Sequence, residues 1–358
     1  MSVVGVLGGS GAVGKVAVDR LAAYGLGPLR VGARDLERVA QVCAALPGVA
    51  ATPVRADLTD PKSLREFCAG CRVVVNCAGP SYRVLDTVAR TALAAGADYV
   101  DAAGDIVAIE ALASHAEDRL ADRVAVFSAG LMPGLSGLLP RLLAEQGPLS
   151  RLDLFVGGAA AIGPLSAVDA LLTRGPKFGV ALAAWREGRI VPGALAPLRS
   201  IVLPGFKGRV QAWPFLSVEA SRLAAELRVA ELRNYTVYVT DAIPRALAAA
   251  WADDTEPIER HVAALVAAAD ADIAATGPYY TMLFQAVPRR HAPGRARRLI
   301  LHTPDSYALS GVVAAATARE VLSGRIGPGA HLAAEVLSPK EVLALLDDDP
   351  LVTGVELR

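Results

Sequence analysis

The first 34 residues constrain the fold of this chain more than any other segment. An apolar strand at residues 3–7 runs into a glycine-rich turn, a helical stretch follows, and a second strand ends at Arg34. The turn fits the pattern G-x-G-x-x-G in the strand–turn–helix context that dinucleotide binding requires. Its glycines permit close approach of the backbone to a pyrophosphate, and amides at the helix N-terminus face the phosphates. The expected contacts are Gly9, Ser10, Gly11, Ala12, Val13 and Gly14.

The end of the second strand indicates which dinucleotide is bound. NAD enzymes place an Asp or Glu about 20 residues beyond the glycines to hold the ribose 2′-hydroxyl, whereas an arginine there suits a 2′-phosphate. This chain has Arg34 at that place and Arg38 one turn later. Asp35 could take the acid's role, or it could cap the following helix. Because a guanidinium binds phosphate through paired hydrogen bonds, the pattern favours NADP(H) over NAD(H).

Length and composition limit the class of protein and its partners. A chain of 358 residues, 53% of them hydrophobic, is long enough for two domains with buried cores. A formal net charge of +0 gives no reason to expect nucleic-acid binding, and no apolar run is long enough to span a bilayer. Since the first strand begins at Val3, we expect no cleavable signal and a cytoplasmic location.

The cysteines indicate neither a disulfide framework nor a metal site. Cys68 and Cys71 form a C-x-x-C pair, but no second pair accompanies it to complete a zinc site. In a thioredoxin-like protein such a pair opens a helix, whereas here it precedes a strand. We therefore expect structural cysteines and no bound metal.

The order of predicted elements indicates the fold class. Strands and helices alternate over the first 130 residues, with strands near 3–7, 29–33, 51–55, 72–77, 99–101 and 124–127. Beyond residue 152, strands and helices mix without strict alternation. We predict an α/β protein: a Rossmann doubly wound parallel sheet, a second α+β substrate domain, and C-terminal helices that return to the first domain. The expected boundaries are 1–135 for the NADP-binding domain, 136–305 for the substrate and dimerisation domain, and 306–358 for the returning helices.

Three segments together resemble the saccharopine dehydrogenase (reductase)-like NADP-binding family. They are the glycine turn with Arg34, residues 76–80 with 94–105, and residues 128–136, which are similar to the family's G-x-x-P-G turn. The resemblance is specific over about the first 140 residues. It implies an inserted substrate domain, a homodimer, and NADP-linked reduction of an imine or oxidation of a secondary amine.

A rival family also begins with a glycine-rich turn, the short-chain dehydrogenases. Its catalytic signature is Tyr-x-x-x-Lys, and no tyrosine of this chain has a lysine four residues later. That argues against catalysis of this kind, but leaves open a relative that binds NADP(H) without catalysis.

Ligands of open α/β sheets lie beyond the carboxyl ends of the strands, so we place the remaining cofactor contacts in the loops there. Arg34 and Arg38 are expected at the 2′-phosphate, and Asp57 with Leu58 at the adenine, although Asp57 could be only a turn residue. Asn76 is expected to contact the cofactor or to cap its strand. The other expected contacts are Ala78, Gly79, Pro80 and Gly130.

Three polar residues are candidates for catalysis. Tyr307 opens the helix predicted to return to the cleft, where it either acts on the substrate or packs between domains. Asp101 follows the fifth strand as an acid, or as an acceptor for nearby loop amides. Tyr82 lies in the loop after the fourth strand.

We expect an NADPH-dependent reductase that transfers hydride to the C=N group of a small, rather apolar substrate, in secondary metabolism. An enoyl reductase that reduces C=C is the nearest alternative. A non-catalytic NADP(H)-sensing protein is the alternative outside enzymes.

Overall fold

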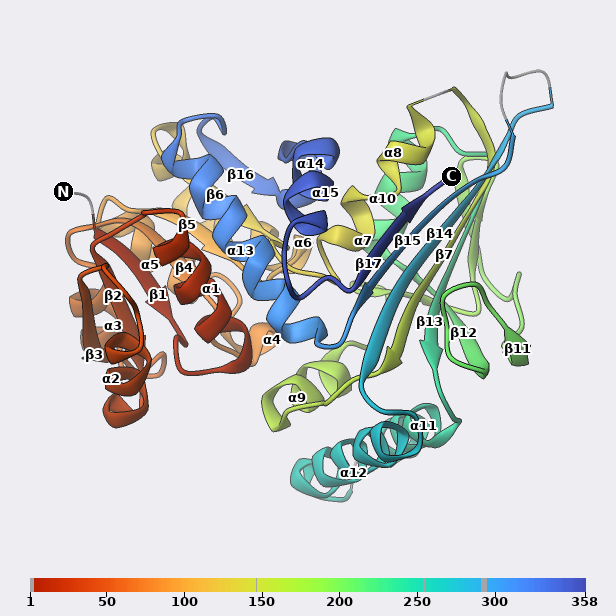
Figure 1. The fold of residues 1–358 in the computed structure, drawn as a ribbon, viewed down its shortest axis with the longest axis horizontal. Helices are drawn as coiled ribbons and strands as arrows, with labels where there is room; N and C mark the ends of the chain where they lie inside the picture. The colour runs from red at the N-terminus through yellow and green to blue at the C-terminus, as the bar shows by residue number, and fades with distance from the viewer. Residues whose placement is uncertain (1–2, 146, 254, 291–294) are drawn as a thin grey trace. The chain divides into compact units, whose positions relative to one another are not determined.

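The computed structural model describes residues 3–145, 147–253, 255–290 and 295–358. They divide into two compact units, each with its own sheet (Figure 1). The first unit runs to Leu138 and resumes with Tyr307–Val342, and the second comprises Leu139–Ser306 and Leu343–Arg358.

The first unit is built on a parallel sheet. Its strand order is β16-β6-β5-β4-β1-β2-β3, so the chain winds in one direction from β1 to β3 and in the other from β4 to β6. The order reverses between β1 and β4, where ligands of such sheets bind. The strands are β1 (Val3–Leu7), β2 (Leu29–Ala33), β3 (Ala51–Arg55), β4 (Cys71–Asn76), β5 (Asp98–Asp101), β6 (Val124–Phe127) and β16 (Gly329–Leu332).

Helices cover both faces of this sheet, which explains its nearly continuous apolar strands. On one face, Phe67, Tyr99 and Phe127 centre a core to which α3, α5 and α6 contribute. The helices of the unit are α1 (Ala12–Ala23), α2 (Leu36–Ala44), α3 (Pro61–Cys68), α4 (Ser81–Val84), α5 (Thr87–Ala94), α6 (Ile106–Ala116), the 3₁₀ helix η1 (Glu117–Ala121), α7 (Leu135–Leu138), α13 (Ser306–Leu322) and α14 (Ala333–Val336); α15 (Pro339–Asp347) runs across the boundary between the units.

The returning segment joins the first unit through a helix and a strand. α13 lies beside α1 (Figure 1), so close that a Cβ on Gly311 would collide with the backbone oxygen of Val13. β16 then pairs in parallel with β6. The sequence of β16, Gly-Ala-His-Leu, has no pattern typical of a strand, and this strand was not predicted. The predicted fold class, with a doubly wound parallel sheet and returning helices, is confirmed.

The second unit is built on a mixed sheet. The order along its main path is β10-β9-β13-β7-β14-β15-β17, and β12 joins β13, β11 and β8 beside it. β7 lies between β13, which is parallel to it, and β14, which is antiparallel. The strands are β7 (Leu149–Ala159), β8 (Gly179–Ala181), β9 (Ala184–Arg186), β10 (Arg189–Val191), β11 (Leu198–Val202), β12 (Arg209–Ser217), β13 (Glu231–Tyr238), β14 (Tyr279–Pro288), β15 (Arg297–Thr303) and β17 (Gly354–Leu357).

One face of this sheet has an apolar middle. Phe155 and Tyr235 stack there with ring centroids 4.7 Å apart, and Leu203 and Phe206 pack on the same core. A second core joins α9, α11 and α12 to one another. The helices of the unit are α8 (Arg141–Ala144), α9 (Pro164–Leu172), α10 (Val218–Glu226), α11 (Ala242–Ala252) and α12 (Ile258–Thr276).

The C-terminal segment predicted as residues 306–358 is divided between the units, because β17 pairs with β15. Among the described residues, none of the helices combines the length and apolar character needed to cross a membrane.

Candidate functional site

The glycine turn after β1 is held tightly against its neighbours. The backbone nitrogens of Gly8 and Gly9 donate to the oxygen of Gly32 at 2.7 and 3.1 Å. Gly8 has a φ of 79°, and a Cβ there would lie 2.8 Å from the nitrogen of Ala78. A Cβ on Gly14 would collide with the oxygen of Gly8. At Gly8 and Gly14 the chain thus has no room for a side chain, which fits the close packing of a diphosphate-binding turn.

The first turn of α1 offers its amides to a ligand. Its N-cap, Gly11, has no side chain to cap them, and the turn contains no acidic residue. Gly11 and Ala12 are exposed, and Ser10 and Val13 are half-buried. Unpaired amides and the positive end of the helix dipole favour an anion at this place. The residues present therefore fit the diphosphate of a dinucleotide.

Exposed arginines follow β2 and end β3. Asp35 caps α2 by accepting a hydrogen bond from the backbone nitrogen of Arg38 at 3.1 Å, so its carboxylate serves the helix. Arg34 and Arg38 are exposed beside it. Arg55, which sequence reasoning missed, pairs in register with Ala33, next to Arg34. The sequence could have indicated Arg55, because parallel strands end at the same edge of the sheet and Arg55 is the last residue of the strand beside β2.

Asp57 lies close to this arginine group. It accepts hydrogen bonds from the backbone nitrogen and hydroxyl of Thr59 at 2.9 and 2.7 Å. These hydrogen bonds, aided by the charges of Arg34 and Arg55, lower the pKa of the Asp57 carboxyl. Asp57 thus forms a turn, and the neighbouring Leu58 packs partly on the core.

Asn76 ties the loop after β4 into the protein. Its side-chain nitrogen donates to Asp101 at 3.1 Å, and its oxygen accepts from the nitrogen of Ala78 at 3.1 Å. It is only 2% exposed. Ala78, Gly79 and Pro80, which it supports, are half-buried and face outward in part.

Asp101 is the centre of a buried hydrogen-bond network. One carboxylate oxygen accepts from Asn76 and from the hydroxyl of Tyr99. The other accepts from the nitrogens of Ala103 and Gly104 at 2.9 and 2.8 Å. Asp101 is 3% exposed, and its oxygens are engaged. Asp101 thus connects Asn76 to the loop that follows β5.

Tyr82 and Asp105 form a hydrogen-bonded pair at the carboxyl ends of β4 and β5. The Tyr82 hydroxyl donates to the carboxylate of Asp105 at 2.8 Å, and the nitrogen of Val107 donates to the other oxygen at 3.0 Å. Burial raises the pKa of the Asp105 carboxyl, and the hydrogen bond from Tyr82 only partly opposes this. The pair can therefore hold a proton that an ordinary aspartate would have lost.

The turn after β6 packs deep in the first unit. A Cβ on Gly130 would collide with the oxygen of Ala102, and the nitrogen of Leu131 donates to the hydroxyl of Ser310 at 3.1 Å. Met132 is 46% exposed at the tip. α13 thus supports this turn.

Tyr307 is the second residue of α13 and is half-buried. It lies one turn before Gly311, the residue that contacts the first turn of α1. Residues four apart lie on the same face of a helix, so Tyr307 is on the face that meets α1.

The cysteine pair is buried. Burial raises the pKa of Cys68 to about 12 and also raises the pKa of Cys71, so both are thiols at neutral pH. Within the described ranges, no group of His, Cys, Asp and Glu side chains could hold a metal ion.

Comparison with known proteins finds a family model that matches the first domain. Residues 4–130 match the family model described as the saccharopine dehydrogenase NADP binding domain. A comparison with curated proteins gives no match.

One solved structure supports this fold, and two others give weaker matches. Apo saccharopine dehydrogenase (L-Glu forming) from Saccharomyces cerevisiae superposes with a TM-score of 0.68 and 16% identity, covering 100% of both chains. A putative myo-inositol dehydrogenase from Sinorhizobium meliloti gives 0.49 with 8% identity, over 96% of this chain and 94% of the other. A myo-inositol dehydrogenase from Corynebacterium glutamicum gives 0.46 with 10% identity, over 90% and 89%.

Proposed function

We propose that this chain, whose residues 4–130 belong to the saccharopine dehydrogenase NADP-binding family, is an NADPH-dependent reductase of a C=N group in a small, rather apolar substrate. The family is one of NADP-binding oxidoreductases, and NADP(H) is the cofactor of the first domain. The proposal assigns the cofactor to residues 1–135, and the substrate and dimer contacts to residues 136–305.

The proposed cofactor site follows the edge of the parallel sheet. The glycine turn of residues 9–14 would hold the diphosphate through the uncapped amides of the first turn of α1, and Arg34 with Arg38 and Arg55 would hold the 2′-phosphate. Asp57 and Leu58 would border the adenine. The loop of Ala78, Gly79 and Pro80, fixed by Asn76, would run along the ribose, and Gly130 would approach the nicotinamide.

The pair formed by Tyr82 and Asp105 is the observation that carries the proposed chemistry. When bound, NADPH supplies the hydride. Reduction of C=N also consumes one proton at nitrogen, and the Tyr82 hydroxyl can donate it. Because its pKa is raised, the Asp105 carboxyl can carry a proton and pass it to the Tyr82 oxygen after the phenol has given up its own. The pair lies beyond β4 and β5, on the side of the switch point where the nicotinamide half of a dinucleotide binds.

Two other candidates take supporting roles in this proposal. Asp101 positions Asn76 and the loop after β5, since its oxygens already accept hydrogen bonds. Tyr307 would contact the substrate from α13, near the first turn of α1.

The test is NADPH oxidation with cyclic imines, with pairs of a keto acid and an amine, and with enoyl thioesters. Turnover of the imines or of the pairs, reduced at least tenfold in Tyr82→Phe, supports the proposal. Turnover of enoyl thioesters alone would establish C=C reduction instead. Tight NADPH binding without turnover of any of them would favour a sensing protein.

A further inference from the structure

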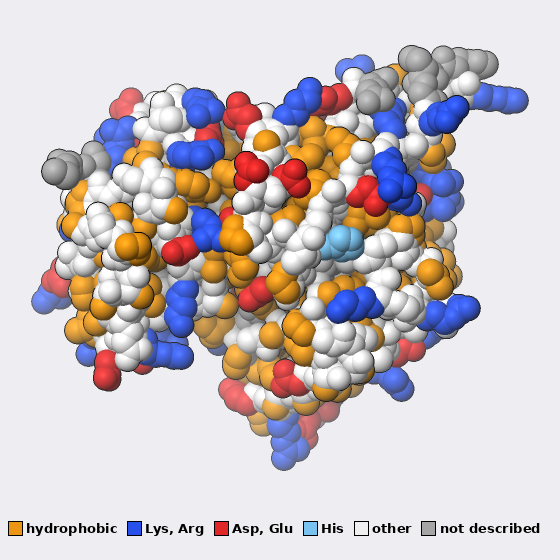
Figure 2. Space-filling view, in the orientation of Figure 1, with side chains coloured by type: hydrophobic (Ala, Val, Ile, Leu, Met, Phe, Trp, Pro, Cys, Tyr) orange, Lys and Arg blue, Asp and Glu red, His pale blue; other side chains and the backbone are white. Residues whose placement is uncertain are grey.

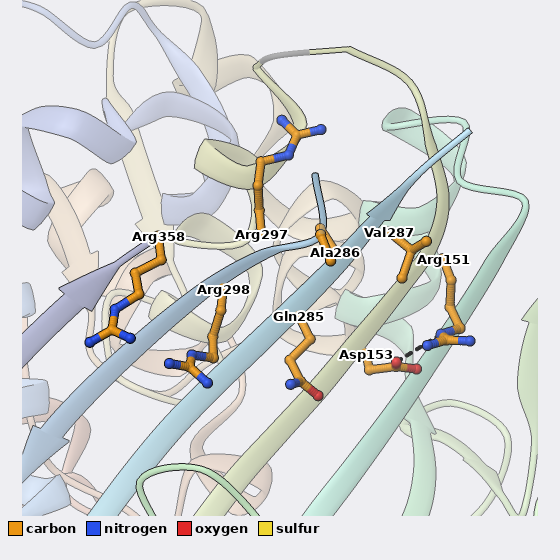
Figure 3. A pocket seen from close by; sticks show the side chains of 9 residues that line it. Arg151, Asp153, Gln285, Ala286, Val287, Arg297, Arg298 and Arg358 are labelled. Atoms are coloured by element: carbon orange, nitrogen blue, oxygen red, sulfur yellow. Dashed lines mark hydrogen bonds and ion pairs between the residues drawn. The ribbon is translucent and has the colours of Figure 1, made fainter. Parts of the chain in front are cut away.

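A cavity of about 370 Å³ lies on the sheet of the second unit, and none of the residues that line it is assigned to the cofactor (Figure 3). Strands β7, β14 and β15 and the residue after β17 line it. Its size is near the lower end for pockets that bind small molecules.

Cross-strand pairing gathers polar side chains on this face of the sheet. Asp153 of β7 lies opposite Gln285 of β14, Gln285 lies opposite Arg298 of β15, and Arg298 exchanges backbone hydrogen bonds with Arg358. Arg151 points to the same face, because it is two residues from Asp153 on one strand. Figure 3 shows these side chains on the same side of the strands.

Each carboxylate of this face is held between two arginines. Asp153 accepts a hydrogen bond from Arg151 at 2.9 Å, and the nitrogen Nε of Arg233 lies 3.9 Å from its other oxygen. On the other side of Gln285, Glu356 accepts from Arg298 and lies 2.9 Å from the Nε of Arg358. Arg233 is itself paired with Glu231 at 2.8 Å. The lining of the cavity, however, contains four arginines and one carboxylate, that of Asp153, which leaves an excess of positive charge around it.

Several donors in this lining have no acceptor among the described residues. The Nε of Arg298 is buried and makes no hydrogen bond. Arg297, which also lines the cavity, is 7% exposed, and its three guanidinium nitrogens find no acceptor. Figure 3 shows its side chain leaving β15 in the direction opposite to that of Arg298. Because a buried guanidinium keeps its charge, Arg297 adds to the positive potential that reaches the cavity.

We propose that this cavity is a binding site for a small oxyanion, the phosphate or carboxylate group of a small molecule other than the cofactor. Arg298, Arg358 and Arg151 would donate to its oxygens, and the amide of Gln285 would contact it from the floor. A bound oxyanion would offset the positive charge of this lining and would give the buried Nε of Arg298 an acceptor, which stabilises a buried donor. In Figure 2, Lys and Arg side chains gather on the upper right of the molecule, where these strands end.

The test uses the full chain without NADPH, in a phosphate-free buffer of low ionic strength. Isothermal titration with inorganic phosphate and, separately, with succinate distinguishes the two oxyanions. We expect a dissociation constant of about 1 mM or lower for at least one of them. Arg298→Gln should weaken that binding by about tenfold or more, since it removes charge-assisted hydrogen bonds. Arg358→Gln, at the exposed chain end, serves as a second variant if the first does not fold.

A matched control is Arg189→Gln, which changes an exposed arginine of β10 at the far end of the same sheet. It should leave oxyanion binding unchanged, and NADPH affinity should be the same in all three variants. Absence of binding by both oxyanions, or equal weakening by Arg189→Gln, would overturn the proposal. Because the readout is binding without cofactor, its failure is distinct from a failure of the proposed reductase activity.

Discussion

The hydroxyl of Tyr82 donates a 2.8 Å hydrogen bond to the carboxylate of Asp105 and joins the loops that follow β4 and β5. The hydrogen bond pairs a phenol with a carboxyl whose pKa is raised by burial. Such a pair at the carboxyl edge of a dinucleotide-binding sheet can deliver a proton to the atom beside the one that receives hydride.

Removal of the phenol hydroxyl should slow the reaction without loss of cofactor. We expect Tyr82→Phe to lower kcat by about 10²–10⁴-fold, the usual contribution of a general acid, with unchanged NADPH affinity. Stopped-flow turnover and NADPH fluorescence titration measure the two quantities. Tyr24→Phe is the control, because Tyr24 contacts Arg319 through its ring, which phenylalanine retains. Equal kcat in both variants would remove Tyr82 from the mechanism.

The pH dependence of turnover should report on Asp105. A carboxyl with a raised pKa is protonated below that pKa and loses its proton as the pH rises through it. If this proton resupplies Tyr82, kcat falls as the pH rises through the pKa of Asp105, which lies above the ordinary aspartate pKa of about 3.9. In Asp105→Asn, this limb of the pH–rate profile should be absent. Superimposable profiles of the two proteins, measured from about pH 4 to pH 9, would show that Asp105 supplies no proton.

The arginines after β2 and β3 should select the phosphorylated cofactor. Arg34→Glu is expected to weaken NADPH binding by about 100-fold, through loss of charge-assisted hydrogen bonds and added repulsion, and NADH binding by much less. Arg65→Glu, at an exposed position of α3, serves as a control for net charge. Competition titration with both nucleotides measures the ratio, and equal loss for NADPH and NADH would contradict the assignment of Arg34.

Asp101 should matter for stability more than for chemistry. Asp101→Asn puts an amide among hydrogen-bond donors in a buried network, so we expect the free energy of unfolding to fall by about 2–4 kcal/mol. The exposed substitution Asp122→Asn should change it by less than about 0.5 kcal/mol. Urea unfolding of both variants is the measurement. A stable Asp101→Asn protein without activity would return Asp101 to the list of catalytic residues.

The first domain could be predicted because its signals are local. The apolar run Val73–Val75, the glycine turn and the cap formed by Asp35 each act within a few residues, and the structure contains all of them. Parallel strands then bring their carboxyl ends to one edge, so the loops of the candidate site follow from strand order alone.

The features that could not be predicted depend on contacts between residues far apart in sequence. The pairing of Gln285 with Asp153 and Arg298 creates the arginine-lined cavity. No local sequence pattern predicts this pairing. The pairing of β16 with β6 and the place of Arg55 beside Arg34 are of the same kind. The contacts of Asp101 could not be predicted from the sequence either. Only the folded chain shows that its carboxylate oxygens accept hydrogen bonds from Asn76, Tyr99 and two loop amides.

The central claim is that the glycine turn of the first domain holds the diphosphate of NADPH. A crystal structure of the protein with NADPH tests it most directly. We expect the diphosphate against the backbone of residues 9–14 and the 2′-phosphate among Arg34, Arg38 and Arg55. NADPH bound elsewhere, with the amides of that turn still facing solvent, would contradict it.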